Sequence, residues 1–192
     1  MAIGLDANDE LAWVRMTGGE DDIMLVSQGG QAVRFREEVV RPMGRPAAGV
    51  IGIRMAKGDR VIASEAVVAG KDLLVVAEKG LGKRTNTDHF ITKGRGGKGV
   101  TAMKLTTRTG QIVGAGMVDD DHNLMLMSSS GKVIRLPVSQ IPTIGRQTQG
   151  VTLMKLDADE MVATMTIAER KDDDGDPSLP PLNGHGDVSS LS

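Results

Sequence analysis

A segment of about fifty residues occurs three times along this chain, and this repeat limits the possible folds more than any other feature. Each copy begins with Asp or Asn and four apolar residues, at positions 22–26, 72–76 and 123–127. A turn with a glycine follows, and nineteen residues after it comes a second glycine, which is Gly49, Gly99 or Gly150. Strands are predicted after these second glycines, at 50–55, 100–105 and 151–156, and a further strand is predicted near 60–68, 111–118 and 160–168. Four short strands per unit at this period predict an all-β, propeller-like array of blades.

The repeat also predicts the domain organisation. We expect complete blades at about 18–68, 69–118 and 119–168, preceded by a half blade at 1–17 that matches only the second part of a unit. Closed propellers usually have four to eight blades, so three and a half blades predict an open arc or part of a larger protein. Residues 171–192 are rich in Asp, Pro, Ser and Gly without apolar periodicity, which predicts a disordered acidic tail.

Composition excludes several classes of protein. The 192 residues are 40% hydrophobic and 25% charged, which is enough for a folded core. No window approaches the length of an apolar membrane span, and Met1 is followed by no signal-peptide pattern, so we expect a cytoplasmic protein without a membrane partner. Cys is absent, which excludes disulfides, thiolate metal sites and cysteine nucleophiles.

Positive charge is concentrated at one place in each repeat. The three segments 30–49, 80–99 and 131–150 hold twelve Lys or Arg against three acids, a balance of +9, so with a net charge of −2 the rest of the chain carries −11. A recurrent cation position predicts a basic rim that binds nucleic acid. The alternative is that loops are simply charged. The predicted DNA-binding cations are Arg34, Arg36, Arg41, Arg45, Lys83, Arg84, Lys93, Arg95, Lys98, Lys132, Arg135 and Arg146.

The glycine-rich stretch Lys93–Gly99 is a weak signal when taken alone, but its fixed place in the repeat favours a functional role. Its glycines Gly96, Gly97 and Gly99 allow the backbone to approach an anion, and the Lys and Arg side chains add charge. The stretch formally matches a dinucleotide-binding pattern and resembles a P-loop. Those loops must open a helix, whereas this one precedes a β-branched strand. Phosphate contacts are therefore favoured, and a hairpin loop with solvated cations is the alternative.

The kind of nucleic acid can be narrowed. Only Trp13, Phe35 and Phe90 are aromatic, which is too few for the stacking track of a single-strand binder. No recognition helix is predicted, so contacts should go to duplex phosphates, with the DNA bent along the rim. Two other classes stay open, a scaffold propeller that binds protein and an enzyme on a propeller. Against an enzyme, His89, His122 and His185 are isolated and expected to be solvated, and neither a catalytic constellation nor a metal site stands out.

Several short runs of this sequence match a known family. They are Asp9-Glu10-Leu11, Ile23–Val26, Val33-Arg34-Phe35, Val40–Arg45, Gly82–Thr85, Val113-Gly114-Ala115, Gly131–Arg135 and Ile144–Val151. On these residues, the chain resembles the C-terminal domains of DNA gyrase A subunits over about residues 2–168. The resemblance implies a β-pinwheel, a propeller-like fold whose blades exchange strands, with duplex DNA wrapped around its basic edge. The A subunits of topoisomerase IV have related blades and are the alternative family.

The resemblance also implies a role and partners. It implies a non-catalytic, nucleoid-associated DNA-wrapping domain that supports ATP-dependent supercoiling by a bacterial type IIA topoisomerase. The implied partners are the gyrase B subunit, together with the remainder of the A subunit. Strand cleavage in this family needs a tyrosine, and this sequence has none. The resemblance therefore assigns the catalytic, Mg²⁺ and ATP sites to other parts of the enzyme, and no cofactor is expected in this chain.

One motif departs from the family pattern. The family carries a Gln-Arg-Arg-Gly-Gly-Lys-Gly box in its first blade, and Arg95–Gly99 match its last five positions. Lys93 and Gly94 stand where Gln and Arg are expected. The loop also lies in the second complete repeat, so we interpret it as a box-like loop of a late blade.

Overall fold

The computed structural model describes residues 3–7 and 9–169. The predicted acidic tail at 171–192 lies outside the described residues. Within them, no helix is long and apolar enough to cross a membrane.

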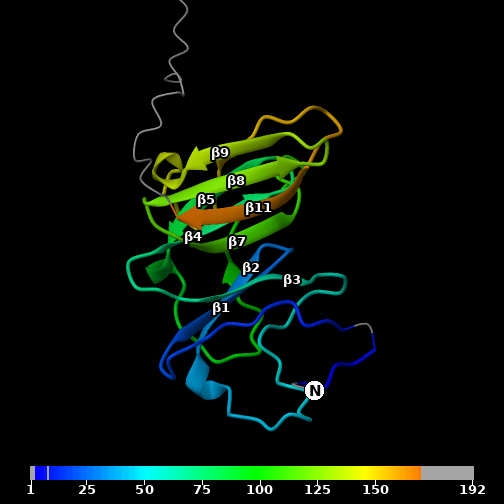
Figure 1. The fold of residues 1–192 in the computed structure, drawn as a ribbon, viewed down its shortest axis with the longest axis vertical. Helices are drawn as coiled ribbons and strands as arrows, with labels where there is room; N and C mark the ends of the chain where they lie inside the picture. The colour runs from blue at the N-terminus through cyan, green and yellow to red at the C-terminus, as the bar shows by residue number, and fades with distance from the viewer. Residues whose placement is uncertain (1–2, 8, 170–192) are drawn as a thin grey trace, which may run out of the picture.

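The described residues form three antiparallel sheets, one for each repeat, and three short 3₁₀ helices. The sheets follow one another along the long axis of the molecule (Figure 1). The predicted all-β, propeller-like fold is therefore confirmed. The strands are β1 Asp22–Ser27, β2 Gln31–Arg36, β3 Val61–Ala66, β4 Asp72–Ala77, β5 Leu81–Asn86, β6 Val100–Thr101, β7 Ile112–Val118, β8 His122–Ser128, β9 Val133–Pro137, β10 Val151–Thr152 and β11 Val162–Glu169. The 3₁₀ helices are η1 Glu37–Val39, η2 Thr87–His89 and η3 Val138–Gln140.

Strand exchange links neighbouring repeats. The first sheet has the order β3-β1-β2-β6, although β6 belongs to the second repeat. The second has the order β10-β5-β4-β7, although β10 belongs to the third repeat, and the third sheet has the order β11-β8-β9 among the described residues. The exchanged residues pair in equivalent registers, with Val100 opposite Ala32 and Val151 opposite Gly82. This arrangement confirms the exchange of strands expected of a β-pinwheel.

Glycine makes the exchange possible. Gly99 and Gly150 both have a φ of +77°, a conformation that is strained for other residues. A Cβ on Gly99 would lie 2.4 Å from the carbonyl oxygen of Ala32, and a Cβ on Gly150 would lie 2.5 Å from that of Gly82. The incoming segment can therefore approach the acceptor strand only if glycine occupies this position.

Two predictions about the blade are corrected. The segments predicted as inter-strand loops contain β2, β5 and β9, because their first residues fold back to pair with the preceding strand. The strands predicted at 100–105 and 151–156 shorten to β6 and β10, and in 50–55 there is only an isolated bridge at Ile53. Each incoming segment pairs with only two residues of its acceptor strand, Gln31 and Ala32 of β2 or Leu81 and Gly82 of β5.

The predicted half blade is also corrected. Residues 3–7 and 9–20 form no strand. A strand needs a partner for its backbone hydrogen bonds, and this segment matches only the second part of a unit. It lies instead along the first repeat, where the amide of Gly4 donates to the carbonyl of Ala47 at 3.1 Å.

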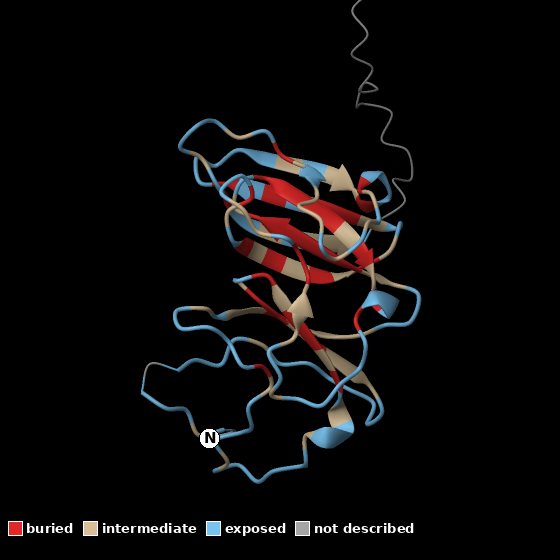
Figure 2. Cartoon of the chain, turned by 180° about the vertical axis from the view of Figure 1, so that it is seen from behind, coloured by how far each residue is buried: buried red, intermediate tan, exposed pale blue. Residues whose placement is uncertain are grey.

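The core lies between the sheets. Strand β4 is buried on both faces: Leu73 and Val75 pack toward the first sheet, and Leu74 and Val76 pack toward the third. Each such side chain contributes about 1.5–3 kcal/mol when fully buried. Figure 2 shows burial concentrated in the strands, whereas the long segments near the N-terminal end are exposed. The core thus holds the sheets in line and leaves the connecting segments at the surface.

Candidate nucleic-acid interface

The segments that end just after the second glycine of each repeat contact one another in sequence order. The guanidinium of Arg95 donates to the carbonyls of Val39 and Ile51 in the preceding repeat, at 3.2 and 3.3 Å. Arg146 makes the equivalent contact one repeat later, at 3.1 Å from the carbonyl of Thr101. Hydrogen bonds from an arginine therefore connect segment 90–101 to segment 39–51, and segment 141–152 to segment 90–101. We call these three segments together the basic row.

The basic row carries charge of one sign. Its three segments contain two, three and one cations and no Asp or Glu. Five of the six cations are exposed, and none of these five forms a side-chain ion pair within 4.0 Å among the described residues. They are Arg41, Arg45, Lys93, Arg95 and Lys98. Because no described acid pairs with these five cations, the described row has a positive field that would attract a polyanion.

The glycine-rich stretch forms a small basic hollow. A cavity of about 210 Å³ is lined by Lys93 and Lys98 together with Gly94, Gly97 and Gly99. The expectation that successive amides face an anion needs correction at Gly96, whose N–H donates to the carbonyl of Gly52 at 2.6 Å. An anion in this cavity would therefore contact the lysine side chains, and the backbone amide of Gly96 would not be free to bind it.

Two predicted DNA-binding arginines hold the sheets together instead. Arg34 pairs through Nε with Asp22 at 2.6 Å and donates to the carbonyl of Thr87 at 3.0 Å. In the next repeat, Arg84 pairs with Asp120 at 2.6 Å and donates to the carbonyl of Ile141 at 2.7 Å. Arg34 also reaches the carbonyl of Phe90 at 3.5 Å, so each side chain joins its own sheet to the exchanged segment. Both arginines therefore have a structural role, and their contact with DNA stays a prediction.

Lys83 is the clearest correction to the predicted DNA contacts. Its side chain is 0% exposed, and Nζ donates to the carbonyls of Gly145 at 2.6 Å and Arg146 at 2.8 Å. Burial, with a smaller contribution from the charge of Arg146, lowers the pKa of Lys83 to about 8. The equivalent positions in the other repeats hold the apolar Val33 and Ile134. Lys83 therefore anchors the third segment of the basic row from beneath.

The four remaining predicted cations differ in their surroundings. Arg36 is exposed and lies 3.4 Å from Asp22. Lys132 lies 3.2 Å from Glu160, whose hydrogen bond raises the pKa of Lys132. Arg135 is exposed on β9, outside the basic row, and Arg146 is partly buried with its guanidinium 5.9 Å from the centroid of the Phe90 ring. Only Arg146 of these four belongs to the row.

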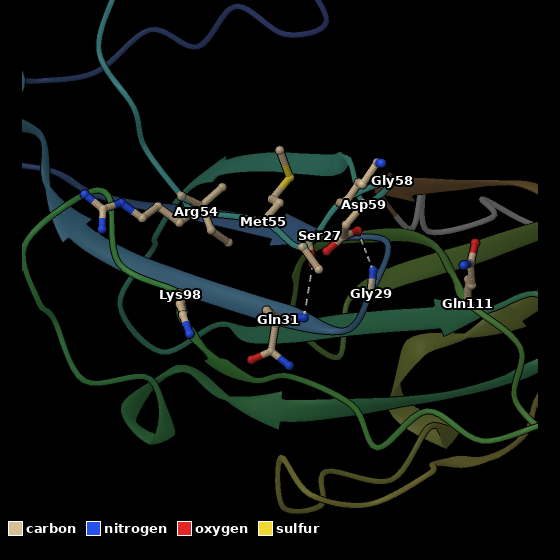
Figure 3. Close-up of a pocket in the computed structure, with 12 residues that line it drawn as sticks. Ser27, Gly29, Gln31, Arg54, Met55, Gly58, Asp59, Lys98 and Gln111 are labelled. Atoms are coloured by element: carbon tan, nitrogen blue, oxygen red, sulfur yellow. Dashed lines mark hydrogen bonds between the residues drawn. The ribbon is translucent and has the colours of Figure 1, made fainter.

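The sequence interpretation missed a second recurrent cation. Arg54, Lys104 and Lys155 occupy equivalent positions after the exchanged segments, and all three are exposed. Arg54 and Lys98 line a pocket of about 740 Å³ with Lys57, although the two come from different repeats (Figure 3). The recurrence at one repeat position was the signal that could have identified them, but they lay inside predicted strands.

The histidines and acids that the structure describes form structural contacts. Among the described residues, no group of three or more His, Asp or Glu is placed to hold a metal ion. His122, at the start of β8, was expected to be solvated, but its Nδ1 contacts the carboxylate of Asp119 instead. The pKa of Asp119 is lowered, mainly by a hydrogen bond from Lys71. These contacts join β8 to the turn that precedes β4.

Comparisons with known proteins match the repeats closely. A family model described as "DNA gyrase C-terminal domain, beta-propeller" matches residues 21–67, 71–119 and 122–169. The DNA gyrase A subunit of Aminobacterium colombiense is 42% identical over 91% of this chain, and that of Escherichia coli K12 is 41% identical over 91%. These matches cover 21% and 20% of the relatives. The chain therefore spans about a fifth of the length of the curated relatives it matches.

Solved structures give the same fold. A structure of a DNA gyrase A C-terminal domain superposes with a TM-score of 0.78 at 26% identity, covering 86% of this chain and 57% of that one. The C-terminal domain of a DNA topoisomerase IV superposes with a TM-score of 0.82 at 23% identity, covering 88% and 53%. The second likeness shows the fold alone.

Proposed function

The chain belongs to the family of DNA gyrase C-terminal domains, and from this premise we propose that it binds duplex DNA along the basic row and bends the duplex around it. The observation that carries the proposal is the row itself, in which three joined segments present cations without an acid. The proposed contacts are with phosphates, which position DNA without reading its sequence.

The extent of the row is the basis for the proposed bend. The row crosses three blades, and we propose that a duplex contacting all three segments curves to follow them. Smooth bending of a 20–30 bp site by 40–90° costs roughly 1–6 kcal/mol. Contacts to several phosphates offset this cost. The proposal therefore predicts that the outer segments are engaged only by DNA long enough to reach them.

The aromatic residues support duplex over single-stranded DNA. Phe35 and Phe90 are buried, and Trp13 lies outside the basic row. Bases of a single strand would have no aromatic surface in the row on which to stack. The proposed ligand is therefore the double helix.

We propose that the activity of the whole enzyme depends on this domain as part of a type IIA topoisomerase. The proposed partners are the gyrase B subunit, together with the remainder of the A subunit, and the proposed location is the cytoplasm, on DNA. Strand cleavage in this family uses a tyrosine, which this chain lacks. Cleavage and the use of Mg²⁺ and ATP are accordingly proposed for those other parts.

The experiment is a titration with duplexes at several salt concentrations. If the six cations of the row neutralise about six phosphates, log K should fall with log salt at a slope of about −5. Linear duplexes of increasing length and a single strand of matched length complete the series. A slope near zero would contradict DNA binding. A steep slope without preference for longer duplexes would retain binding and contradict bending.

A further inference from the structure

Lys83 is a buried amine at a strand position where the fold does not require one. Its side chain is 0% exposed, whereas the equivalent positions of the first and third repeats hold the apolar Val33 and Ile134. Burying a charged side chain is costly unless acceptors or an opposite charge compensate it. An apolar residue can therefore fill this position, and packing alone does not account for the lysine.

The hydrogen bonds of Lys83 suit a neutral amine better than an ammonium. The carbonyls of Gly145 and Arg146 accept from Nζ at 2.6 and 2.8 Å, and Nζ makes no third hydrogen bond among the described residues. A neutral amine has two N–H groups, and both are then used. An ammonium has three, so protonation of Lys83 adds a buried donor without a described acceptor.

The described groups packed around Lys83 supply no negative charge. On β4, Val75 lies opposite Lys83, and Asp72 accepts instead from the hydroxyl of Thr143 at 2.7 Å. Segment 141–152 contains Arg146 but no Asp or Glu. Burial, and then the charge of Arg146, lower the pKa of Lys83 to about 8. An anion close to Arg146 would remove part of this penalty.

Arg146 connects Lys83 to the proposed DNA interface. Its carbonyl accepts from Lys83, while its guanidinium lies 5.9 Å from the centroid of the Phe90 ring and donates to the carbonyl of Thr101 at 3.1 Å. The side chain is partly exposed, and it forms no ion pair with an acid that the structure describes. A DNA phosphate at Arg146 would therefore place a negative charge near Lys83 for the first time among the described groups.

We propose that Lys83 is a positioning residue for Arg146, and that binding of duplex DNA at Arg146 draws a proton onto Lys83. This inference rests on the proposed function and adds a linked proton to it. The phosphate offsets the positive field of Arg146, so the charged form of Lys83 becomes more favourable in the complex. Because linkage is reciprocal, a proton that binds more tightly in the complex also strengthens DNA binding.

The sign of the pH effect follows from this linkage. Well below the pKa of about 8, Lys83 carries its proton with and without DNA, so the affinity is at its highest. As the pH rises, the free protein loses the proton first and the affinity falls. If DNA raises the pKa of Lys83 by about one unit, the association constant falls about fivefold between pH 7 and pH 9.

Calorimetry measures the proton directly. Duplex is titrated into the protein at pH 8.5 and constant salt, in two buffers with different enthalpies of ionisation, and the difference in heat gives the protons taken up. The wild type should take up about half a proton more per bound duplex than Lys83→Met, which keeps a long side chain without the amine. Lys79→Met is the matched control, because Lys79 is an exposed lysine of the same repeat outside the basic row. It should match the wild type.

Arg146→Gln tests the link without changing the buried side chain. Glutamine carries no charge, so it neither repels the proton of Lys83 nor draws a phosphate to this place. We expect this variant to lose most of the extra proton uptake, and its affinity should change less than that of the wild type between pH 7 and pH 9. If Lys83→Met does not fold, the comparison of Arg146→Gln with Lys79→Met decides.

The outcomes separate this inference from the proposed function. Loss of the extra proton uptake in Lys83→Met and Arg146→Gln, but not in Lys79→Met, supports both. Equal uptake by the wild type and all three variants would overturn the linkage through Lys83 while DNA binding stands. A wild-type protein that binds no duplex at any pH would overturn the proposed function, and this inference with it.

Discussion

The ammonium of Lys83 lies 2.6 Å from the carbonyl oxygen of Gly145, so a buried cation of the second repeat fastens the loop that carries Arg146. A second bond from Lys83 reaches the carbonyl of Arg146 itself, and Thr85 donates to the carbonyl of Ile144 at 2.8 Å. Three consecutive carbonyls of the exchanged segment are thus held from β5. This joint couples the stability of the fold to the position of a proposed DNA contact.

Lys83 should make stability depend on pH. Its pKa is lowered to about 8 in the folded protein, from 10.5, so between these values the unfolded chain binds more protons and stability rises with pH. Lys83→Met removes this dependence. Urea unfolding of the two proteins from pH 7 to 10.5 should show the wild type gaining up to about 3 kcal/mol relative to the variant. A constant difference across this range would mean that burial of Lys83 does not lower its pKa.

The position of a cation should matter more than its number. Arg45→Ala with Lys98→Ala removes two charges from the basic row, and the slope of log K against log salt should become shallower by about 2. Lys132→Ala with Arg135→Ala removes the same charge outside the row and should leave the slope nearly unchanged. Duplex titrations at several salt concentrations give both slopes. Equal changes in the two double variants would show that the whole surface attracts DNA without a defined row.

Arg95 should affect the shape of bound DNA more than the affinity. Its guanidinium holds the carbonyls of Val39 and Ile51, and Arg95→Lys keeps the charge but loses the planar pair of donors. We therefore expect an unchanged salt slope and a smaller bend, measured by FRET between the ends of a duplex at saturating protein. Arg41→Lys, at an exposed residue of the same row, is the control. If both variants bend DNA as the wild type does, the contact from Arg95 does not determine the bend of the bound duplex.

Gly99 should be among the least replaceable glycines. In Gly99→Ala the new Cβ would lie 2.4 Å from the carbonyl oxygen of Ala32, and the φ of +77° adds strain. We expect a loss of roughly 2–4 kcal/mol in the free energy of unfolding. Gly70→Ala has a φ of +80° and open space around the added Cβ, so it should cost only about 1 kcal/mol. Similar losses in urea unfolding would mean that close approach adds nothing to backbone strain.

Much of the fold could be predicted because its signals are local. The apolar runs at 22–26, 72–76 and 123–127 became β1, β4 and β8, and the stretches near 60–68, 111–118 and 160–168 became β3, β7 and β11. Strands were correctly predicted directly after Gly99 and Gly150, where β6 and β10 begin. The alternation of apolar and polar side chains in a strand, and the residues that favour a turn, both extend over only a few positions. Strands and turns can therefore be predicted from the sequence alone.

The partner of each short strand was decided by tertiary structure. Val100 and Thr101 belong to the second repeat in sequence but pair with β2 of the first. The local sequence does not show whether these residues pair with β5 of their own repeat or with β2 of the preceding one. The backbone groups are the same in both cases, so the choice depends on how neighbouring sheets pack. The family resemblance supplied this expectation, whereas the periodicity alone predicted self-contained blades.

The sequence by itself determined that cations recur once per repeat, and only the tertiary structure decided which of them face solvent. Lys83 and Lys98 are both lysines in one predicted loop, yet Lys83 is buried and Lys98 is exposed beside the pocket of the glycine-rich stretch. The physical reason is that a lysine can be buried only where carbonyl oxygens accept hydrogen bonds from its ammonium group. For Lys83, the carbonyls of Gly145 and Arg146 do so, and they belong to another repeat. Charge is a property of the residue, whereas exposure depends on chain segments more than sixty positions away.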